Sequence, residues 1–348
     1  MKKKNSYTVE DVAEEANVST ATVSRVFSGS AKVNTKTTER VIKAAKKLNY
    51  RPSRVARRLR VKSTQSMVIG LIVTDLQNPF FSEIARGVED VAYENKNGVI
   101  VCNSDENLKK EHFYLDTLLD EQVAGLIMAP TSGNHEYIQE IVDQNVPVVF
   151  VDRHIPSLNV DTVTVDNENG AYKAVKRLIG LGHRRIGIIT GIKGIYTTDQ
   201  RYNGYVKALD EHNIPVDEEL VAYGNSKEQG GIEGTRKLLS LDTPPTAIFS
   251  TNNLMTLGCF EEMYRQNVNV PDDISIVGFD DMSWASALNP PLTAVRQPGY
   301  ELGTTAAELL LKRLRDPART ISNIELHSEL IIRKSCGTSV ARSAADTV

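Results

Sequence analysis

The feature that most constrains the fold is an alternation of short apolar runs with amphipathic stretches that begins at Met67. Short apolar runs between turn signals are typical of buried strands, and the stretches between them have helical spacing. Strands that are apolar throughout indicate parallel sheets covered by helices on both faces. The expected strands are Val68–Val73, Val99–Cys102, Ala124–Met128, Val146–Val151, Ile186–Thr190, Thr246–Ser250 and Ile274–Gly278.

Two segments of this body repeat one pattern. Ile69-Gly70-Leu71-Ile72 and Ile186-Gly187-Ile188-Ile189 each place one glycine among apolar residues, and each opens a series of strands. We therefore expect an α/β body of two similar, doubly wound parallel-sheet subdomains. In open sheets of this kind ligands bind at the carboxyl ends of the strands. The polar residues that follow each strand are accordingly the candidates for a binding site.

The N-terminal part of the chain has the opposite charge from the body. Residues 1–66 carry 16 basic and 5 acidic side chains, whereas residues 67–348 carry 25 basic and 39 acidic ones. A basic head joined to an acidic body suggests that the head binds a polyanion. No acidic residue lies between Arg40 and Thr74, and such a stretch repels itself unless it lies along phosphates.

Three short helices are expected in the head. Thr8 followed by Asp11 forms a helix-capping pattern, and apolar residues then recur at helical spacing. Asn17 suits the left-handed backbone of a tight turn, and Ser19 and Asn34 can cap two further helices. Two short helices joined by a tight turn, with a third behind them, predict an all-α helix-turn-helix head.

The second expected helix has the side chains of a DNA-reading helix. It begins with small polar groups that allow a helix N-terminus to enter a major groove, and Arg25 can reach guanine O6 and N7 one turn later. The alternative is a small helical bundle whose Lys and Arg side chains only solvate it. The charge of the head disfavours that alternative.

Several segments together resemble the lactose-repressor (LacI) family, and the resemblance covers most of the chain. The matching motifs are Asp11-Val12-Ala13, Val18-Ser19-x-Ala21-Thr22-Val23-Ser24-Arg25-Val26, Leu48-Asn49-Tyr50-x-Pro52 and the hinge-like Ser53-Arg54-Val55-Ala56-Arg57-Arg58-Leu59. The resemblance implies a transcriptional regulator, most often a repressor, that binds a palindromic operator as a homodimer. The body is then similar to type I periplasmic binding proteins.

The resemblance assigns roles in the head and in the hinge. Base contacts are expected from Thr20, Ala21 and Arg25. Backbone contacts are expected from Thr8, Ser19, Thr22, Ser24, Asn34 and Lys36. The minor-groove hinge is expected to use Ser53, Ala56, Arg57 and Leu59.

Leu59 carries the most specific expectation. It has basic neighbours and no apolar pocket within its own segment, so we favour a wedge between base pairs over an ordinary buried leucine. The expected hinge helix around Ser53–Leu59 is too short to be stable alone in water. We therefore expect the hinge to become ordered only on DNA.

The strand ends also match effector positions of the family, especially those of ribose binders. The expected effector-binding residues are Asn78, Phe80, Phe81, Asp152, Arg153, Arg201, Asn252, Asp280 and Gln297, with Trp284 either near the cleft or in a core or interface. Aromatic faces beside carboxylate, amide and guanidinium groups suit a neutral sugar. Ala129 and Asn253 depart from the ribose-binder pattern.

Simpler structural roles compete with several of these assignments. Asn78 also suits a helix cap, Asp152 with Arg153 could be a surface ion pair, and Asp280 could be a turn residue. Phe80 could belong to the core while Phe81 lines the site. His183 follows a helix stop and is expected to be structural.

Other functions remain as alternatives. A regulator controlled by a sugar acid, a sugar phosphate or a phosphorylated carrier protein would use the same arginines. A nicotinamide enzyme needs a glycine-rich phosphate loop between a strand and a helix. Neither Val73-Thr74-Asp75-Leu76-Gln77-Asn78 nor Thr190-Gly191-Ile192-Lys193-Gly194 has that pattern. A periplasmic sugar-binding protein needs a signal peptide, and the basic start of this chain is not followed by an apolar segment.

The expected organisation follows from these patterns. Residues 1–50 form the DNA-binding domain, 51–65 the hinge helix and linker, 66–336 the effector and dimerisation core, and 337–348 a disordered tail. Within the core, the N-subdomain covers about 66–164 and 295–323, and the C-subdomain about 165–294 and 324–336. Three scattered cysteines indicate reduced thiols. We expect a cytoplasmic protein with no metal, no cofactor and no membrane partner.

Overall fold

The computed structural model describes residues 7–28, 33–48, 50, 68–133 and 135–337. The chain divides into two compact units, residues 1–65 and 66–348, which we call the head and the body and describe separately. The expected hinge (51–65) and all but the first residue of the expected tail lie outside the described residues. No helix in the described ranges is long and apolar enough to cross a membrane.

The head contains the three helices that the sequence predicts: α1 (Val9–Glu15), α2 (Thr20–Ser28) and α3 (Thr35–Lys47). Thr8 and Asp11 form the capping box of α1, and Asn34 caps α3. Asn17 has φ 49° in the turn between α1 and α2, the left-handed conformation that asparagine tolerates. Small apolar side chains form the core of the head, namely Val12, Ala13, Ala16, Val23, Val41, Ala44 and Ala45.

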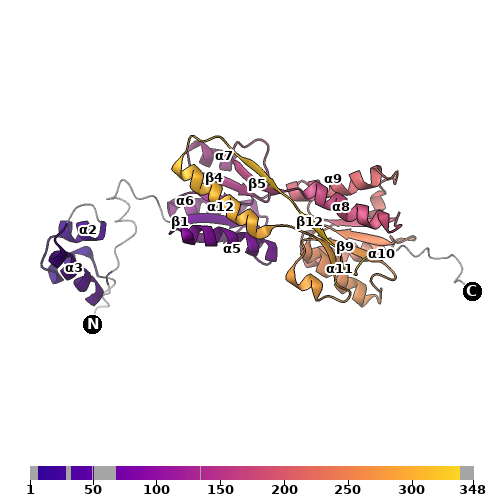
Figure 1. Ribbon diagram of the computed structural model, residues 1–348, viewed down its shortest axis with the longest axis horizontal. Helices are drawn as coiled ribbons and strands as arrows, with labels where there is room; N and C mark the ends of the chain where they lie inside the picture. The colour runs from indigo at the N-terminus through magenta and orange to yellow at the C-terminus, as the bar shows by residue number, and fades with distance from the viewer. Residues whose placement is uncertain (1–6, 29–32, 49, 51–67, 134, 338–348) are drawn as a thin grey trace, which may run out of the picture. The chain divides into compact units, whose positions relative to one another are not determined.

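The body consists of two lobes, each built on a six-stranded sheet (Figure 1). The N-lobe sheet has the order β11-β5-β4-β3-β1-β2, and the C-lobe sheet has the order β12-β10-β9-β8-β6-β7. The N-lobe strands are β1 (Val68–Val73), β2 (Gly98–Asn103), β3 (Leu126–Met128), β4 (Val148–Val151), β5 (Asp161–Val165) and β11 (Asn323–Leu326). The C-lobe strands are β6 (Ile186–Thr190), β7 (Val221–Tyr223), β8 (Ala247–Ser250), β9 (Ser275–Phe279), β10 (Thr293–Arg296) and β12 (Glu329–Ile331).

Helices cover both faces of each sheet, as the apolar strands predict. In the N-lobe, α5 (Pro79–Glu94) and α12 (Gly299–Arg315) pack together on one face, and α6 (Leu108–Asp120) and α7 (Glu136–Asp143) cover the other. In the C-lobe, α8 (Asn167–Gly180) pairs with α9 (Tyr196–Asp210), and α10 (Glu228–Leu239) pairs with α11 (Asn253–Arg265). Two short 3-10 helices, η1 (Glu218–Leu220) and η2 (Ser283–Ser286), complete this lobe.

The predicted internal repeat is present. β1 and β6 occupy the same place in their sheets, and their glycines make the same close approach to a helix. A Cβ on Gly70 would lie 2.8 Å from a methyl of Leu118 in α6, and a Cβ on Gly187 would lie 2.8 Å from a methyl of Leu238 in α10.

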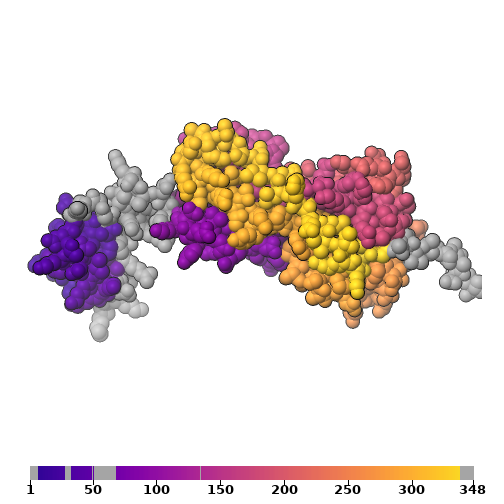
Figure 2. Space-filling view, viewed as in Figure 1, coloured from indigo at the N-terminus to yellow at the C-terminus, as the bar shows by residue number. Residues whose placement is uncertain are grey.

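The chain passes between the lobes three times, after β5, after β10 and after β11, and Figure 2 shows the C-terminal residues in yellow on both lobes. The subdomain bounds expected from the sequence place these crossings at 164/165, 294/295 and 323/324, whereas all three points lie inside the strands β5, β10 and β11, and the crossings lie just beyond these strands. These strands were not predicted because their sequences are short and mix polar with apolar residues. The expectation of all-parallel sheets is also wrong for one edge, because β12 pairs antiparallel with β10.

Candidate DNA interface and ligand cavity

The three residues predicted to read bases lie together on α2. Thr20, Ala21 and Arg25 are all exposed, whereas Val23 between them is fully buried in the core of the head. The fold of the head therefore turns this edge of α2 outward. An exposed helix N-terminus with short side chains and one arginine has the form that a major groove accepts.

The predicted backbone contacts cluster at helix N-termini. Thr8 caps α1 and Asn34 caps α3, while Ser19 accepts a hydrogen bond from the Thr22 amide of α2 at 3.2 Å. Helix N-termini attract phosphate through their amides and their dipole. Lys36 is exposed in the first turn of α3, and Ser24 is half-buried on α2. The hinge residues Ser53, Ala56, Arg57 and Leu59 lie outside the described residues.

The body contains a cavity of about 60 Å³ between the lobes, which we call the inner cavity. It is formed by strand ends from both sheets, as the topology predicts. Eight of the predicted effector residues line it: Asn78, Phe80, Phe81, Asp152, Arg153, Arg201, Asn252 and Asp280. The rings of Phe80 and Phe81 meet edge to face at 5.2 Å, and both also belong to the N-lobe core.

Two aspartates face the inner cavity from equivalent positions of the two lobes. Asp152 follows β4 and Asp280 follows β9, and their φ angles are 70° and 72°. This left-handed conformation is uncommon for non-glycine residues, but aspartate tolerates it. Both side chains are almost fully buried. Asp280 is therefore more than a turn residue, and the two lobes present matching carboxylates.

Each of these aspartates has a buried arginine beside it. Arg153 Nε lies 3.5 Å from Asp152, and its guanidinium also pairs with Glu106 and donates to the Pro130 carbonyl. Because both members are buried, the alternative of a surface ion pair for Asp152 and Arg153 is wrong.

Arg201 is fixed in the C-lobe by four contacts, one of which is a hydrogen bond that it donates to the Thr251 carbonyl at 2.7 Å. Its guanidinium lies 3.9 Å from Asp280, stacks 3.9 Å above the Phe279 ring, and donates to Asn167 Oδ1 at 2.8 Å. These contacts hold the guanidinium against the wall of the inner cavity.

Burial changes the acidity of this cluster. It raises the pKa of Asp152 to about 6, against the opposing effect of Arg153 and Arg201. Burial also raises the pKa of Asp280, although Arg201 and a hydrogen bond from Gln297 act in the opposite direction. The pKa of Arg201 itself is lowered by burial. The cluster therefore contains carboxylates that a ligand hydroxyl can hydrogen-bond and stabilise in the ionised form.

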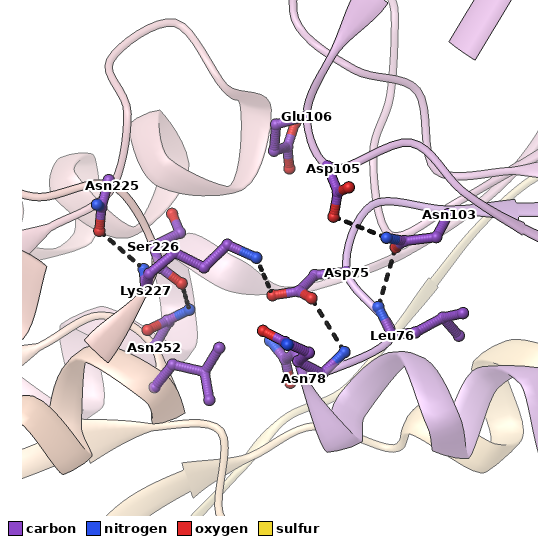
Figure 3. Close-up of polar contacts among 12 residues, drawn as sticks. Asp75, Leu76, Asn78, Asn103, Asp105, Glu106, Asn225, Ser226, Lys227 and Asn252 are labelled. Carbon is purple, nitrogen blue, oxygen red and sulfur yellow. Dashed lines mark hydrogen bonds and ion pairs between the residues drawn. The ribbon is translucent and has the colours of Figure 1, made fainter. Parts of the chain in front are cut away.

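Two polar contacts connect the lobes across the inner cavity. Lys227 of the C-lobe lies 2.6 Å from Asp75 of the N-lobe (Figure 3). Asn253 Nδ2 donates to Asn78 Oδ1 at 2.8 Å, while the same Asn78 oxygen caps α5 through the Phe80 amide. The capping role and the cavity role of Asn78 are therefore both realised.

Two predicted residues lie outside the cavity wall. Gln297 donates to Asp280 Oδ1 and supports that carboxylate from behind. Trp284 is half-buried and packs against the hydrophobic cores of both lobes, so the structure gives it the core role rather than the cleft role. His183 is structural as expected, since its ring nitrogens bond to Thr246 Oγ1 and the Gly337 carbonyl.

Glu106 and Lys227 both line the inner cavity but were not predicted from the sequence. Glu106 follows β2, so the strand-end rule could have found it. Lys227 follows β7, a three-residue strand too short to recognise. No group of His, Cys, Asp and Glu in the described ranges could hold a metal ion.

A helix-turn-helix head and a two-lobed body with a polar cavity between its lobes define a ligand-responsive DNA-binding regulator. Comparison with known proteins agrees with this class. Residues 8–53 match the model of the bacterial regulatory proteins of the lacI family, and residues 175–336 match a periplasmic binding protein-like domain.

Three individual proteins are similar over nearly their whole lengths. Catabolite control protein A of Priestia megaterium is 36% identical, with 94% of this chain and 98% of that protein covered. A LacI family regulator from Enterococcus faecium, solved with bound ribose, is 31% identical over 78% of this chain and 98% of its own, with a TM-score of 0.72. The lac repressor dimer bound to operator and an anti-inducer is 30% identical over 95% and 99%, with a TM-score of 0.81.

The chain belongs to the LacI family of bacterial transcriptional regulators. It is a DNA-binding transcriptional repressor, and its relatives are regulators rather than enzymes.

Proposed function

We propose that this repressor binds a palindromic operator as a homodimer and that a neutral sugar in the inner cavity controls it, with ribose as the first candidate. The Enterococcus faecium relative with bound ribose supports the ligand, and the operator-bound lac repressor dimer supports the assembly. Since its target is chromosomal DNA, we place the protein in the cytoplasm.

The observation that carries the sugar assignment is an unsatisfied oxygen at the inner cavity. Asp152 lines this cavity, and its Oδ1 is buried and has no hydrogen-bond partner among the described residues. A buried acceptor without a partner is costly, by about 1–3 kcal/mol. Ring hydroxyls would donate to such acceptors, while Phe80 and Phe81 offer the apolar surface that a sugar ring also needs.

The charge of the inner cavity favours a neutral ligand over an anionic one. Each cation of its wall has an acidic partner: Arg153 pairs with Glu106, Arg201 with Asp280, and Lys227 with Asp75. An anionic ligand would have to displace one of these carboxylates and leave it buried near its own charge. Sugar acids and sugar phosphates are therefore second choices, and so is control by a phosphorylated carrier protein.

In the head, we assign sequence reading to Thr20, Ala21 and Arg25, and phosphate contacts to the helix N-termini. Residues 1–50 then form the reading domain, and residues 51–65 insert Leu59 into the minor groove at the operator centre. The predicted positioning contacts are those of Thr8, Ser19, Thr22, Ser24, Asn34 and Lys36.

The edge strands of the two sheets indicate the dimer face. β2 and β7 are equivalent edges, and they expose Val101 and Tyr223, while Phe113 is 63% exposed on α6, a helix that contacts β2. Edge strands with exposed apolar side chains are normally covered. We propose that the same face of a second copy covers them in a two-fold interface.

The effector then acts by selecting one arrangement of the lobes. It can shift the equilibrium only by the difference between its affinities for the two arrangements. Because the N-lobe is preceded in the chain by the hinge, a change in the relation of the lobes can alter the spacing of the two hinge segments in the dimer.

The test combines two titrations on the full chain. Fluorescence anisotropy with a palindromic operator, with and without sugar, measures DNA binding, and isothermal titration against neutral pentoses and hexoses measures effector binding. We expect operator binding that weakens with salt and changes when one of these sugars is added. Operator binding without any response to a neutral sugar would contradict the effector assignment and leave the DNA assignment intact.

A further inference from the structure

Another pocket lies between the lobes, and we call it the rear pocket. Its volume is about 820 Å³, within the range of roughly 300–1,000 Å³ that is usual for ligand sites. It is lined by the starts of α5 and α12 in the N-lobe, by η2 and β12 in the C-lobe, and by the crossover after β10. The described residues that line it all differ from those of the inner cavity, so the two spaces are separate.

Gln297 stands between the two spaces. Its side chain is 5% exposed, and its Nε2 donates to Asp280, which lines the inner cavity. Gln297 itself lines the rear pocket, and its Oε1 is buried and has no hydrogen-bond partner among the described residues. A buried acceptor without a partner is costly, and an amide that donates to a carboxylate is polarised into a stronger acceptor. The rear pocket therefore needs a donor at this oxygen.

The charge of the wall indicates that the donor is a cation. Three carboxylates of the wall have no ion-pair partner among the described residues, namely Glu83 on α5, Glu301 on α12 and Glu329 on β12. The basic side chains of the wall all have an acidic partner: Arg86 pairs with Asp90, Arg296 and Arg333 with Asp281, and His327 with Asp166. The two arginines on Asp281 leave one positive charge over, which the three free carboxylates outnumber.

Glu83 lies against the start of α12, where this negative charge is concentrated. A Cβ on Gly299 would lie 2.6 Å from Glu83 Oε2, and Glu301 belongs to the same first turn of α12. Partial burial raises the pKa of Glu83, and the carboxylates of Asp280 and Glu301 act in the same direction, against the effect of Arg296. A positive group beside Glu83 would relieve this repulsion.

The rest of the wall suits an organic cation with a carbon chain. Tyr300 is 43% exposed at the rear pocket, and its hydroxyl donates to Asp90, so the face of its ring is available to a ligand. Aromatic faces attract ammonium groups, and Met282 and Pro298 add apolar surface. A metal ion is disfavoured, because no group of acidic, histidine or cysteine side chains in the described ranges has the arrangement to hold one.

We propose that the rear pocket binds a small aliphatic amine, whose ammonium group is held by Glu83 and by Gln297 Oε1 and whose carbon chain lies against Tyr300. A diamine fits this wall best, because Glu301 and Glu329 offer carboxylates to a second ammonium group. The site does not depend on the sugar proposed for the inner cavity. Since both lobes contribute to the wall, a bound amine favours the arrangement of the lobes that brings these residues together, and so acts as a second input to the regulator.

The test is isothermal titration of the full chain, without sugar, with 1,4-diaminobutane. The uncharged molecule of the same length, 1,4-butanediol, is the control ligand. We expect the diamine to bind at a saturable site with a Kd below about 1 mM, more weakly as the salt concentration rises, and the diol not to bind.

Three variants locate the binding. Glu83→Gln should weaken diamine binding roughly tenfold, the loss that follows from removing one charge-assisted hydrogen bond, and Glu301→Gln should weaken it about two- to fivefold. Glu89→Gln is the matched control, because it removes an exposed glutamate of the same helix α5 outside the rear pocket, and it should leave the affinity within about twofold. Glu83 and Glu301 are exposed, and thermal melting checks that each variant keeps its fold.

The outcomes are decisive for the rear pocket alone. No diamine binding, equal binding of the diol, or an affinity that neither Glu83→Gln nor Glu301→Gln lowers would overturn the amine site. An equal loss in Glu89→Gln would also overturn it, because the diamine would then respond to the general negative charge of the body. The sugar titrations of the inner cavity are separate measurements, so either proposal can fail without the other.

Discussion

The ion pair between Lys227 and Asp75 predicts how firmly the lobes close without a ligand. Asp75 follows β1 and Lys227 follows β7, whereas the chain crosses between the lobes near β5, β10 and β11, on the other side of each sheet. The pair therefore lies on the side of the cleft away from the crossings, where opening separates the lobes most. We expect Lys227→Met to shift the body toward an open arrangement.

The magnitude follows from the exposure of the pair. The Lys227 side chain is 39% exposed and that of Asp75 is 11% exposed, so solvent screens the interaction and we assign it about 0.5–1 kcal/mol. Since the pair exists only when the lobes are closed, its loss lowers the closed-to-open ratio by roughly two- to fivefold. Raising the salt concentration should have a similar effect on the unmodified protein and little effect on Lys227→Met.

The assay is energy transfer between labels on Gln144→Cys in the N-lobe and Asp210→Cys in the C-lobe. Both positions are exposed, and the three native cysteines are buried. Lys193→Met serves as the control, because it removes an exposed lysine of the same lobe. A closed fraction of Lys227→Met equal to that of the unmodified chain at low salt would contradict a role of this ion pair in closure. Restored closure in the exchanged pair Asp75→Lys with Lys227→Asp would support it.

Three further predictions concern the inner cavity, the operator and the dimer. Asp152 has its pKa raised to about 6 by burial, so sugar affinity measured by titration calorimetry should fall by up to about tenfold per pH unit below that value, and Asp152→Asn should abolish this dependence. Protonation of Asp152 should also stabilise the folded body as the pH falls from about 6 toward the lower pKa that this aspartate has in the unfolded chain. Thermal melting can measure this gain in stability. Leu59→Ala should weaken operator binding and DNA bending while sugar affinity stays unchanged; unaltered bending in gel-shift assays would contradict the wedge. Phe113→Glu should lower the dimer mass seen by analytical ultracentrifugation, and an unchanged dimer would reject that face.

The sequence was sufficient to predict most of the fold because its strongest signals are local. Apolar strands such as Val68–Val73 and helix caps such as Thr8 and Asn34 are determined by neighbouring residues, and all three are confirmed. Strands β10, β11 and β12 were not predicted, because they are short, partly exposed and dependent on pairing with distant segments. Their place is set by the return of the chain between lobes, which no local pattern encodes.

In the candidate site, too, features with a local sequence signal could be predicted, and features that depend on contacts between distant segments could not. The strand-end rule located Asp152, Arg201 and Asp280, since each lies on or next to a strong secondary-structure signal. The strand-end rule could not predict the ion pairs of Glu106 and Lys227, because these residues come from other strand ends and meet their partners only in the folded body. The left-handed backbone conformation of Asp152 and Asp280 could not be predicted from the sequence either. Aspartate can adopt this conformation but usually does not, so its presence in the sequence does not indicate it.

This arrangement restricts which ligands can act as signals. Asp152 belongs to the N-lobe and Asp280 to the C-lobe, and Lys227 and Asn253 already connect the lobes without a ligand. A molecule that bonds only one aspartate would bind equally well to open and closed arrangements and would shift nothing, however tight its binding. An effector must bond groups of both lobes at once, so its hydroxyls must point to opposite sides of a rigid ring. That requirement selects a sugar ring over a flexible chain of the same polarity, because the ring holds its hydroxyls apart at no further cost in conformational entropy.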